Sequence, residues 1–547
     1  MAYQWQILKD VIPNNLEDLK SLILENRKII TDSDKREFLN PSHPEKLSQA
    51  DFGLDKLACD KAKNLIESHC QKGNKIAIYG DYDVDGVCAT AILWETIYSS
   101  YGGVFPHIPH RESEGYGLSL VGIDICISKG AKLIITIDNG ITAIKAAQYC
   151  KDKGIDLIIV DHHEQGEEIP EAQVILHSKT TCAGALAYSF SQLLSHADPS
   201  HLELAAIAII ADMIPLTGVN RSLVKYGLLA LRETNRIGLK ALFLTSGISP
   251  GTIGTYEVGF IIGPRINAMG RIEHAIDSLR LLCTKNIDKA AALARILDST
   301  NRLRQEETTH ALEHALASVE KKYGQNIPNI LIVSSPEYHQ GIVGLIASKL
   351  SEKFHRPSIA ISEGGEISKG SARSIAGFDI TQHLKLAQSL LLSVGGHFMA
   401  AGISLKTQNI EAFKDKLISI SQEKISSDQM KRVIKIDCKL LLEQVNSSTA
   451  IMLKSLEPFG LGNPEPVFAI NNLNILESRA VGKTNQHLKL LLTDGSFQIA
   501  GIGFNLGNFS SILLPGSKVD TVSTINENSF NGSISLELKI KDVANKS

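Results

Sequence analysis

The sequence predicts a multidomain α/β protein that ends in a small β-barrel. From about residue 56 to residue 220, short apolar runs alternate with helical segments, which is the pattern of a parallel sheet built from βαβ units. A polar stretch over residues 288–322 predicts one long helix, and a second, smaller α/β pattern follows it. Beyond about residue 432, short strands separated by turn residues predict an antiparallel barrel.

Each expected element of the first domain follows from its local pattern. Apolar runs that end at glycine or at a polar residue predict strands, and the segments between them have helical spacing. The strands are expected at residues 75–80, 131–137, 155–160 and 172–177, and the helices at residues 86–100 and 142–154.

The stretch over residues 288–322 contains neither glycine nor proline and has only a thin apolar stripe. One helix of this length would reach ~50 Å and would suit a rigid connection between domains, with two shorter helices of one bundle as the alternative. The second α/β pattern is expected to contain strands at residues 329–335, 358–362 and 366–374 and helices at residues 341–354 and 380–390.

The composition, with 43% hydrophobic and 21% charged residues, is that of a soluble globular protein. A formal net charge of −3 provides no overall attraction to nucleic acid, although a local groove can still be basic. The amino-terminal residues lack the pattern of a signal peptide, and the apolar helical run over 204–216 is too short to span a bilayer. Because the eight cysteines form no CxxC pair, we expect reduced thiols and a cytoplasmic protein.

The segment IYGDYDVDG, residues 78–86, places three aspartates directly after the first apolar run. Like charges this close oppose ionisation unless a cation neutralises them. An EF-hand loop is excluded because its twelfth position is Ile92 and because a strand precedes Asp81. An acidic surface loop is the remaining alternative to a metal site.

Polar residues recur at the ends of the neighbouring strands, and this favours the metal site. Asp138 follows the strand over 131–137, and the tripeptide DHH, residues 161–163, follows the strand over 155–160. The carboxyl ends of parallel strands share one edge of a sheet, where ligands bind. Carboxylates and imidazoles without a thiolate suit Mn²⁺ or Mg²⁺, and this many acids favours two ions ~3.5–4 Å apart, bridged by a shared carboxylate. Asp212, at the end of the apolar helix, is the candidate for a fourth acid.

The ordered set DYDVDG, DNG, DHH and ADMIPL resembles motifs I to IV of the DHH phosphoesterase superfamily. Five further segments resemble the RecJ-type single-stranded-DNA-specific exonucleases: HIPHRESEGYGLS (107–119), GPRINAMGR (263–271), HQGIVGLIASKL (339–350), SARS (371–374) and GGHFMAAG (395–402). The resemblance implies an N-terminal segment (1–55), a DHH domain (56–285), a linker helix (286–325), a DHHA1-like domain (326–425) and an OB-like nucleic-acid-binding domain (430–547).

The resemblance further implies an exonuclease that degrades single-stranded DNA 5′→3′ to 5′-mononucleotides with two ions, Mn²⁺ or Mg²⁺. Asp138 would bridge the ions, one held also by Asp83 and the other by Asp85, His162 and Asp212. Three catalytic neighbours are expected: Asp81 in a supporting role, Asp161 orienting His162, and His163 facing the scissile phosphate.

An enzyme directed to a 5′ end must bind the terminal phosphate. Suitable groups are arginine guanidinium groups, hydroxyl groups and backbone that can approach the phosphate closely. Within the family motifs, seven residues are the candidates for this binding: Arg111, Arg265, Ser371, Arg373, Gly395, Gly396 and His397.

The expected substrate is single-stranded DNA with a 5′ end, and the expected role is in DNA repair and recombination. The protein is expected to be a monomer without membrane contact, and its expected partners are a helicase and a single-strand-binding protein. One alternative is a small-substrate DHH hydrolase, such as an oligoribonuclease or a cyclic-dinucleotide phosphodiesterase. The residues after Arg432 disfavour it, because the resemblance to such enzymes covers only the first two domains. The other alternative, a non-catalytic replisome scaffold, is disfavoured because every ligand position is filled.

Overall fold

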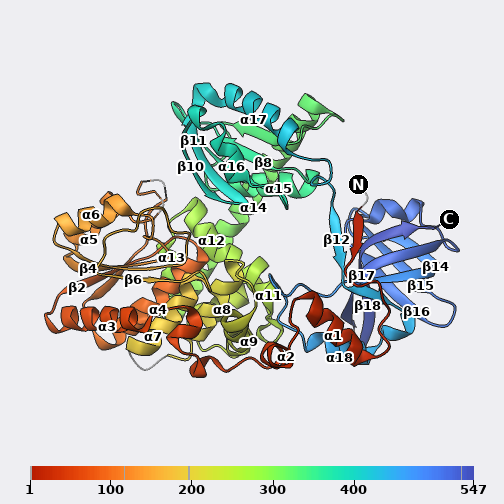
Figure 1. Cartoon of the computed structure of the whole chain (residues 1–547), viewed down its shortest axis with the longest axis horizontal. Coiled ribbons are helices and arrows are strands. Elements are labelled where there is room, and N and C mark those ends of the chain that lie inside the picture. Colours follow the sequence, from red (N-terminus) through yellow and green to blue (C-terminus); the bar gives the residue numbers. More distant parts are fainter. Residues whose placement is uncertain (1–2, 112, 116, 195–197, 531–532, 547) are drawn as a thin grey trace. The chain divides into compact units, whose positions relative to one another are not determined.

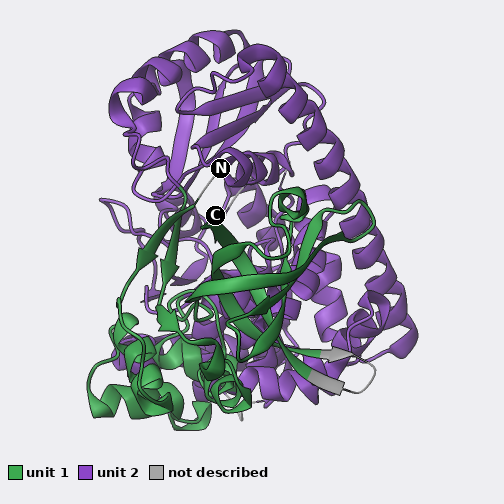
Figure 2. Cartoon of the chain, turned by 90° about the vertical axis from the view of Figure 1, so that its right-hand side faces the viewer, with its two compact units in different colours: residues 1–46, 215–225, 432–547 green, residues 47–214, 226–431 purple. Residues whose placement is uncertain are grey.

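The computed structural model divides the chain into two compact units, which Figure 2 colours separately. Unit 1 comprises residues 1–46, 215–225 and 432–547, and unit 2 comprises residues 47–214 and 226–431. The structure describes residues 3–111, 113–115, 117–194, 198–530 and 533–546. Glu112 and Tyr116, within the motif over 107–119, lie outside the described residues.

A five-stranded parallel sheet of order β3-β2-β4-β5-β6 is the framework of the first part of unit 2 (Figure 1). Its central strands are runs of isoleucine, leucine and valine that are buried on both faces, as helix-covered parallel strands are. The four predicted strands are confirmed, and the edge strand β3 was missed because it has only four residues, one of them proline. The strands are β2 (Lys75–Tyr79), β3 (Val104–His107), β4 (Ala131–Ile137), β5 (Asp156–Asp161) and β6 (Val174–His177).

Helices connect these strands and extend the unit beyond the sheet. The predicted helices over 86–100 and 142–154 are present as α4 (Val84–Ser100) and α6 (Ile144–Asp152). The others are α3 (Lys56–Gln71), α5 (Leu120–Ser128), α7 (Ala183–Leu194), α8 (His201–Ala211), α10 (Ile237–Ser246), α11 (Thr255–Glu257), α12 (Gly263–Ile272) and α13 (Ile276–Cys283), with α9 (Gly218–Arg232) beginning in unit 1.

The helix α14 (Ile287–Tyr323) is continuous over 37 residues, so the alternative of two shorter helices is wrong. Asn286 caps its first turn by accepting a hydrogen bond from the N–H of Lys289. Small residues on its second half, Ala311 and Ala315, pack against the following α/β part of unit 2.

That second part of unit 2 has a five-stranded sheet of order β10-β11-β9-β8-β7, in which only the β7–β8 pair is parallel. The three expected strands are present, and the hairpin of β10 and β11 was not expected from its glycine-rich sequence. The predicted helix over 380–390 ends at Lys385. The elements are β7 (Leu331–Ser335), α15 (Val343–Phe354), β8 (Ser358–Ser362), β9 (Ile367–Arg373), α16 (Ile380–Lys385), β10 (Leu391–His397), β11 (Ala400–Lys406) and α17 (Ile410–Lys424).

The carboxyl-terminal part of unit 1 is a closed five-stranded barrel, because β14 pairs with both β15 and β17. The expected barrel is therefore confirmed, although it is not purely antiparallel: β16 and β18 run parallel. Its elements are β13 (Cys438–Leu440), α18 (Ser447–Lys454), β14 (Phe468–Val481), β15 (His487–Thr493), β16 (Gln498–Gly503), β17 (Lys518–Phe530) and β18 (Ser533–Asn545), and β1 (Gln4–Ile7) pairs with β12 (Val433–Ile436) beside them.

Arg221 is the largest fully buried side chain of unit 1. Its guanidinium donates hydrogen bonds to the backbone carbonyls of Phe38, Leu456, Glu457 and Pro458 and lies 3.7 Å from the centre of the Phe38 ring. Three segments that are far apart in the sequence therefore meet at one side chain, and its hydrogen-bond partners among the described residues are backbone carbonyls.

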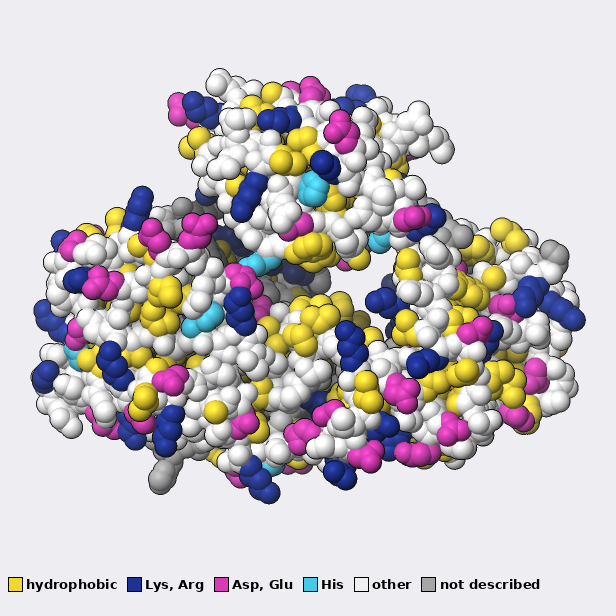
Figure 3. Space-filling view, viewed as in Figure 1, with side chains coloured by type: hydrophobic (Ala, Val, Ile, Leu, Met, Phe, Trp, Pro, Cys, Tyr) yellow, Lys and Arg dark blue, Asp and Glu magenta, His cyan; other side chains and the backbone are white. Residues whose placement is uncertain are grey.

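Basic side chains (Lys and Arg) and acidic side chains (Asp and Glu) are interspersed over the face shown in Figure 3, in keeping with the small net charge of −3. Within the described part of the chain, no helix is both long enough and apolar enough to cross a bilayer.

Candidate metal centre and phosphate pocket

The motif DYDVDG forms the junction between β2 and α4. Asp83 is the N-cap of α4 and accepts a hydrogen bond from the N–H of Gly86, and Asp85 lies in the first turn, where the helix dipole favours a negative charge. Gly86 allows α4 to approach the strand end, since a Cβ there would lie 2.6 Å from the Cβ of Asp81. The local geometry thus turns all three carboxylates toward the carboxyl edge of the sheet.

The next strand end, DNG, is a tight turn that positions Asp138. Asp138 has a φ of 65°, a left-handed conformation that aspartate tolerates better than most residues, and its N–H bonds the carbonyl of Val160 on the neighbouring strand. The Asn139 side chain donates to the carbonyl of Ile137 and so closes the turn.

At the third strand end, Asp161 organises the two histidines. Its Oδ1 accepts hydrogen bonds from Nδ1 of His163 at 2.8 Å and from the N–H of His162 at 2.7 Å, while Oδ2 accepts from the N–H of Ile141. The expectation that Asp161 orients the ring of His162 is therefore wrong: its contact with His162 is to the backbone, and the ring that it orients is that of His163.

These three strand ends and the end of α8 bring the predicted acids and imidazoles together. Nε2 of His162 lies 3.1 Å from Oδ1 of Asp138, 3.5 Å from Oδ2 of Asp85 and 3.8 Å from Oδ2 of Asp212. Two groups of three side chains with no member in common each have potential ligand atoms within 4.8 Å of one another: Asp81, Asp83 and Asp138, and Asp85, His162 and Asp212. A third group, Asp138, His162 and His163, shares a member with each of them.

The electrostatics of this cluster are those of acids that lack a counter-charge. Burial, followed by the charges of neighbouring aspartates, raises the pKa of Asp138 well above its ordinary value and that of Asp212 to about 8. Burial alone would lower the pKa of His163, but its hydrogen bond with Asp161 and the surrounding acids raise it to about 9. Oδ1 of Asp81 is buried and has no hydrogen-bond partner among the described residues. A buried carboxylate oxygen without a hydrogen-bond partner, surrounded by other acidic side chains, is a suitable ligand for a divalent cation.

Without metal, the stability of the protein is expected to fall as the pH rises from 6.5 to 8. Folding raises the pKa of Asp212 from 3.8 to about 8, so its contribution is complete below pH 3.8 and is lost as the pH rises through 8. His163, raised from 6.5 to about 9, acts in the same direction above pH 6.5. Thermal unfolding in chelator would check this. Added Mn²⁺ should oppose the fall, because deprotonated ligands bind metal better. A metal-free melting temperature that rises over this interval would contradict the cluster's electrostatics.

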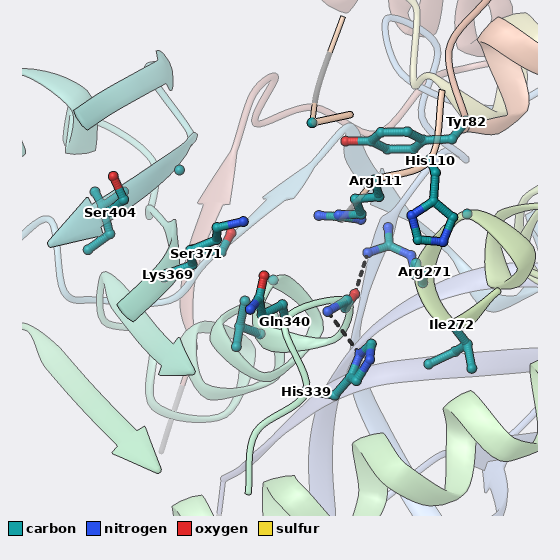
Figure 4. Close-up of a pocket in the computed structure, with 18 of the residues that line it drawn as sticks. Tyr82, His110, Arg111, Arg271, Ile272, His339, Gln340, Lys369, Ser371 and Ser404 are labelled. Atoms are coloured by element: carbon teal, nitrogen blue, oxygen red, sulfur yellow. Dashed lines mark hydrogen bonds between the residues drawn. The ribbon is translucent and has the colours of Figure 1, made fainter. Parts of the chain in front are cut away.

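A pocket of about 520 Å³ begins beside the acidic cluster, at Tyr82, and extends to the face of the second sheet of unit 2 (Figure 4). Arg111 lines it with its guanidinium 5.2 Å from the centre of the Tyr82 ring, and Ser371 and Arg373 line it from β9. Nη1 of Arg373 donates to Oγ of Ser371 at 2.9 Å. The N-terminal end of α15, with N–H groups that lack acceptors within the helix, also borders the pocket at Val343.

Arg271 is the pocket residue that sequence analysis missed. It lies in the motif GPRINAMGR, donates a hydrogen bond to the carbonyl of Gly341, and lines the pocket. Burial, followed by the positive charges of Arg111, Arg304 and Arg373, lowers its pKa to about 10. Several arginines thus gather at one end of the pocket, which is the arrangement that binds phosphate.

The structure corrects the expectation for Arg265, the other arginine of that motif. Its guanidinium donates to Oδ1 of Asp298 on α14 and to the carbonyl of Ile261, and it does not line the pocket. The ion pair with Asp298 holds α12 against α14, so the role that the contacts support is structural.

Gly395, Gly396 and His397 belong to the edge strand β10 and do not line the pocket either, although Ser393 of the same strand does. Gly396 has a φ of 145°, and a Cβ there would lie 2.3 Å from the carbonyl oxygen of Ala400, so the glycine is required by the hairpin. The pKa of Glu164 is lowered mainly by its hydrogen bond with Lys179, and His397 contributes as a nearby positive charge. His397 therefore lies near Glu164, in the loop that follows β5 and the two histidines, His162 and His163.

Comparison with known proteins agrees with this architecture. Family models match residues 75–212 (DHH family, N-terminal domain), 328–423 (DHHA1 domain) and 436–542 (RecJ OB domain). The chain is 34% identical to the single-stranded-DNA-specific exonuclease RecJ of Bacillus subtilis, over 97% of this chain and 68% of the relative, and 31% identical to that of Haemophilus influenzae, over 88% and 89%. The crystal structure of Thermus thermophilus RecJ in complex with Mn²⁺ matches with a TM-score of 0.81 and 27% identity, over 99% of this chain and 79% of that one.

A parallel sheet whose carboxyl edge carries acids and a DHH tripeptide, followed by DHHA1 and OB domains, defines the class: a DHH-family protein. The chain belongs to the RecJ family of single-stranded-DNA-specific exonucleases.

Proposed function

We propose that this protein is a metal-dependent exonuclease that hydrolyses single-stranded DNA from the 5′ end and releases 5′-mononucleotides, in the service of DNA repair and recombination. The observation that carries the proposal is the arginine-lined pocket that begins at Tyr82, a residue that lies in the sequence between Asp81 and Asp83 of the candidate metal centre. A strand whose terminal phosphate occupies this pocket would present its first phosphodiester to the acidic cluster.

The two groups of potential ligands support a pair of divalent ions, Mn²⁺ or Mg²⁺. Asp81, Asp83 and Asp138 would hold one ion, and Asp85, His162 and Asp212, together with Asp138, the other. Asp138 is suited to bridge the two ions because it belongs to the first group of ligands and also contacts His162 of the second group. When bound, such ions activate a shared water and stabilise charge on the phosphate oxygens.

Side chains of the chain itself complete the chemistry. Asp85 is fixed by N–H groups of Ala183 and Gly184 at the start of α7, at 2.8 and 2.7 Å, so its carboxylate is pre-oriented. Without metal, the hydrogen bond with Asp161 and the nearby acids raise the pKa of His163 to about 9, and a protonated ring at this position would attract the scissile phosphodiester. Because water would be the group that attacks phosphorus, the reaction requires no protein nucleophile.

The OB domain would add sequence-independent contacts with the strand through basic side chains and stacking on aromatic rings. Phe504, half-exposed beside Lys539, offers one such surface. A helicase and a single-strand-binding protein are the partners that this activity requires, because duplex DNA must be opened before a single strand can enter. We place the enzyme in the cytoplasm as a monomer, in keeping with its eight free cysteines and with a site assembled from one chain.

Hydrolysis of an end-labelled single strand with Mn²⁺, and then with chelator, tests the proposal. Release of labelled mononucleotide from the 5′ end before any shortening from the 3′ end is the expected result. Activity confined to dinucleotides would favour the small-substrate hydrolase instead.

Arg373→Ala is expected to lower the preference for a 5′-phosphate over a 5′-hydroxyl about tenfold, the worth of one charge-assisted hydrogen bond. Arg373 lies in the pocket, and its loss leaves the metal cluster unchanged. The ratio of kcat/KM for the two ends is the measurement. Arg265→Ala is the matched control, because this partly buried arginine pairs with Asp298 outside the pocket and should leave the ratio unchanged. An equal effect of both substitutions would argue against the pocket.

A further inference from the structure

The phosphate pocket is longer than a terminal monophosphate needs. Its volume of about 520 Å³ lies in the range of sites that hold whole small molecules, ~300–1,000 Å³. Figure 4 places Tyr82, Arg111 and Arg271 at one side and Ser404 at the other, with Ser371 and Lys369 between them. The pocket therefore has a far end, on the opposite side from the acidic cluster, that the terminal phosphate alone would leave empty.

The strand β9 carries polar side chains from the near end to the far end. Arg373, Ser371 and Lys369 occupy every second position of this strand, so their side chains lie on the same face. The Cα atoms of successive members of such a row are ~6.7 Å apart. Lys369 pairs in register with Ser404 of β11, whose hydroxyl lies 2.6 Å from that of Ser393 on β10. Lys369, Ser404 and Ser393 thus form a second polar group, two such steps along the strand from Arg373, or ~13 Å between Cα atoms.

The space above this group is open. A Cβ built on Gly402, which pairs with Ser371 on the floor of the pocket, would meet no atom within 4 Å. Lys369 is exposed and makes no hydrogen bond or ion pair with any of the described residues. The Lys369 ammonium group and the hydroxyl groups of Ser393 and Ser404, with open space beside them above Gly402, are suitable donors for further phosphate oxygens.

The charge of the pocket also exceeds that of a monophosphate. Arg111, Arg271, Arg373 and Lys369 contribute four positive charges to the lining, against one negative charge from Glu273, leaving an excess of three. A terminal monophosphate carries at most two negative charges, whereas a terminal triphosphate carries about four at neutral pH.

We propose that the pocket accepts strands with a 5′-diphosphate or 5′-triphosphate, with the α-phosphate at the arginines and the outer phosphates at Lys369, Ser393 and Ser404. The inference rests on the proposed exonuclease function and extends its substrate class. Water would attack the first internucleotide phosphorus and the bond from phosphorus to the 3′-oxygen would break. The terminal nucleotide would leave as a nucleoside triphosphate with a 3′-hydroxyl, and the remaining strand would keep a 5′-monophosphate.

The test uses the full chain with Mn²⁺ and three DNA oligonucleotides of one sequence that end in a 5′-triphosphate, a 5′-monophosphate or a 5′-hydroxyl. Wild-type protein is expected to release the deoxynucleoside triphosphate, identified by anion-exchange chromatography, with kcat/KM within about threefold of the monophosphate end. Lys369→Met is expected to lower the ratio of triphosphate to monophosphate kcat/KM about tenfold. Lys406→Met, an exposed lysine of the same sheet outside the pocket, should leave that ratio unchanged.

A triphosphate end that resists hydrolysis while the monophosphate strand is degraded would overturn the inference and leave the proposed function intact. So would an unchanged ratio in Lys369→Met, which would mark Lys369 as a solvated surface residue. Failure to degrade the monophosphate strand would instead contradict the proposed function, so the two failures are distinguishable.

Discussion

Asp138→Asn is expected to reduce Mn²⁺-dependent hydrolysis of single-stranded DNA about a thousandfold or more. Asp138 is the acid that approaches both groups of potential ligands, so its loss removes a carboxylate from each ion site. A loss of about 4 kcal/mol of transition-state stabilisation corresponds to a thousandfold in rate. Asparagine is chosen because it tolerates the left-handed φ of 65° that alanine would strain.

The measurement is single-turnover hydrolysis of a 5′-labelled strand, with Asp415→Ala, an exposed acid on α17, as the control for charge removal. The fold should survive, because the raised pKa of Asp138 means that its ionised form is disfavoured in the metal-free protein. Asp138→Asn should therefore melt in chelator no lower than the wild type, yet gain less stability from Mn²⁺. Undiminished turnover in this variant would refute the shared ligand.

Arg221→Ala is expected to destabilise unit 1 by about 3 kcal/mol or more, since it removes the side-chain donor of the Phe38 and Glu457 carbonyls and leaves a cavity, whereas the carbonyls of Leu456 and Pro458 keep a donor in Asn463. The guanidinium is the common donor to the segments that contain Phe38 and Glu457. Hydrogen exchange of the amides in residues 36–46 and 447–467 should accelerate, and denaturant unfolding should lose stability in the transition of unit 1.

Lys225→Ala is the matched control for Arg221→Ala. Lys225 lies one turn further along α9 and donates a single hydrogen bond, to the carbonyl of Leu39, so its removal should cost about 1 kcal/mol. Equal losses from both substitutions would show that Arg221 does not have the special role assigned to it.

The elements that sequence analysis predicted well are those whose pattern is local. The strands β2, β4 and β5 are continuous apolar runs, and all three end within a residue of the expected position. The helix α14 was foreseen because it lacks glycine and proline over its whole length. The hairpin of β10 and β11 was missed because its pairing with β9 is set by tertiary contact, which overrides the weak strand preference of a glycine-rich segment.

The residues of the candidate site also fall into two sets: those that a local pattern predicts and those that tertiary packing decides. The acids and histidines could be placed together because parallel strand ends share an edge, a rule that needs only the order of the strands. The arginines could not be sorted in this way. Arg265 and Arg271 lie in one motif six residues apart, and only the packing of α12 decides that the first pairs with Asp298 while the second enters the pocket.

Anomalous diffraction from a crystal soaked in Mn²⁺ is the most direct test of the central claim, that acids from separate strand ends share a pair of divalent ions. We expect two peaks about 3.5–4 Å apart, with Asp138 between them and His162 and Asp212 on one of the two. A map with no peak among these side chains, at a manganese concentration that supports hydrolysis, would contradict the account.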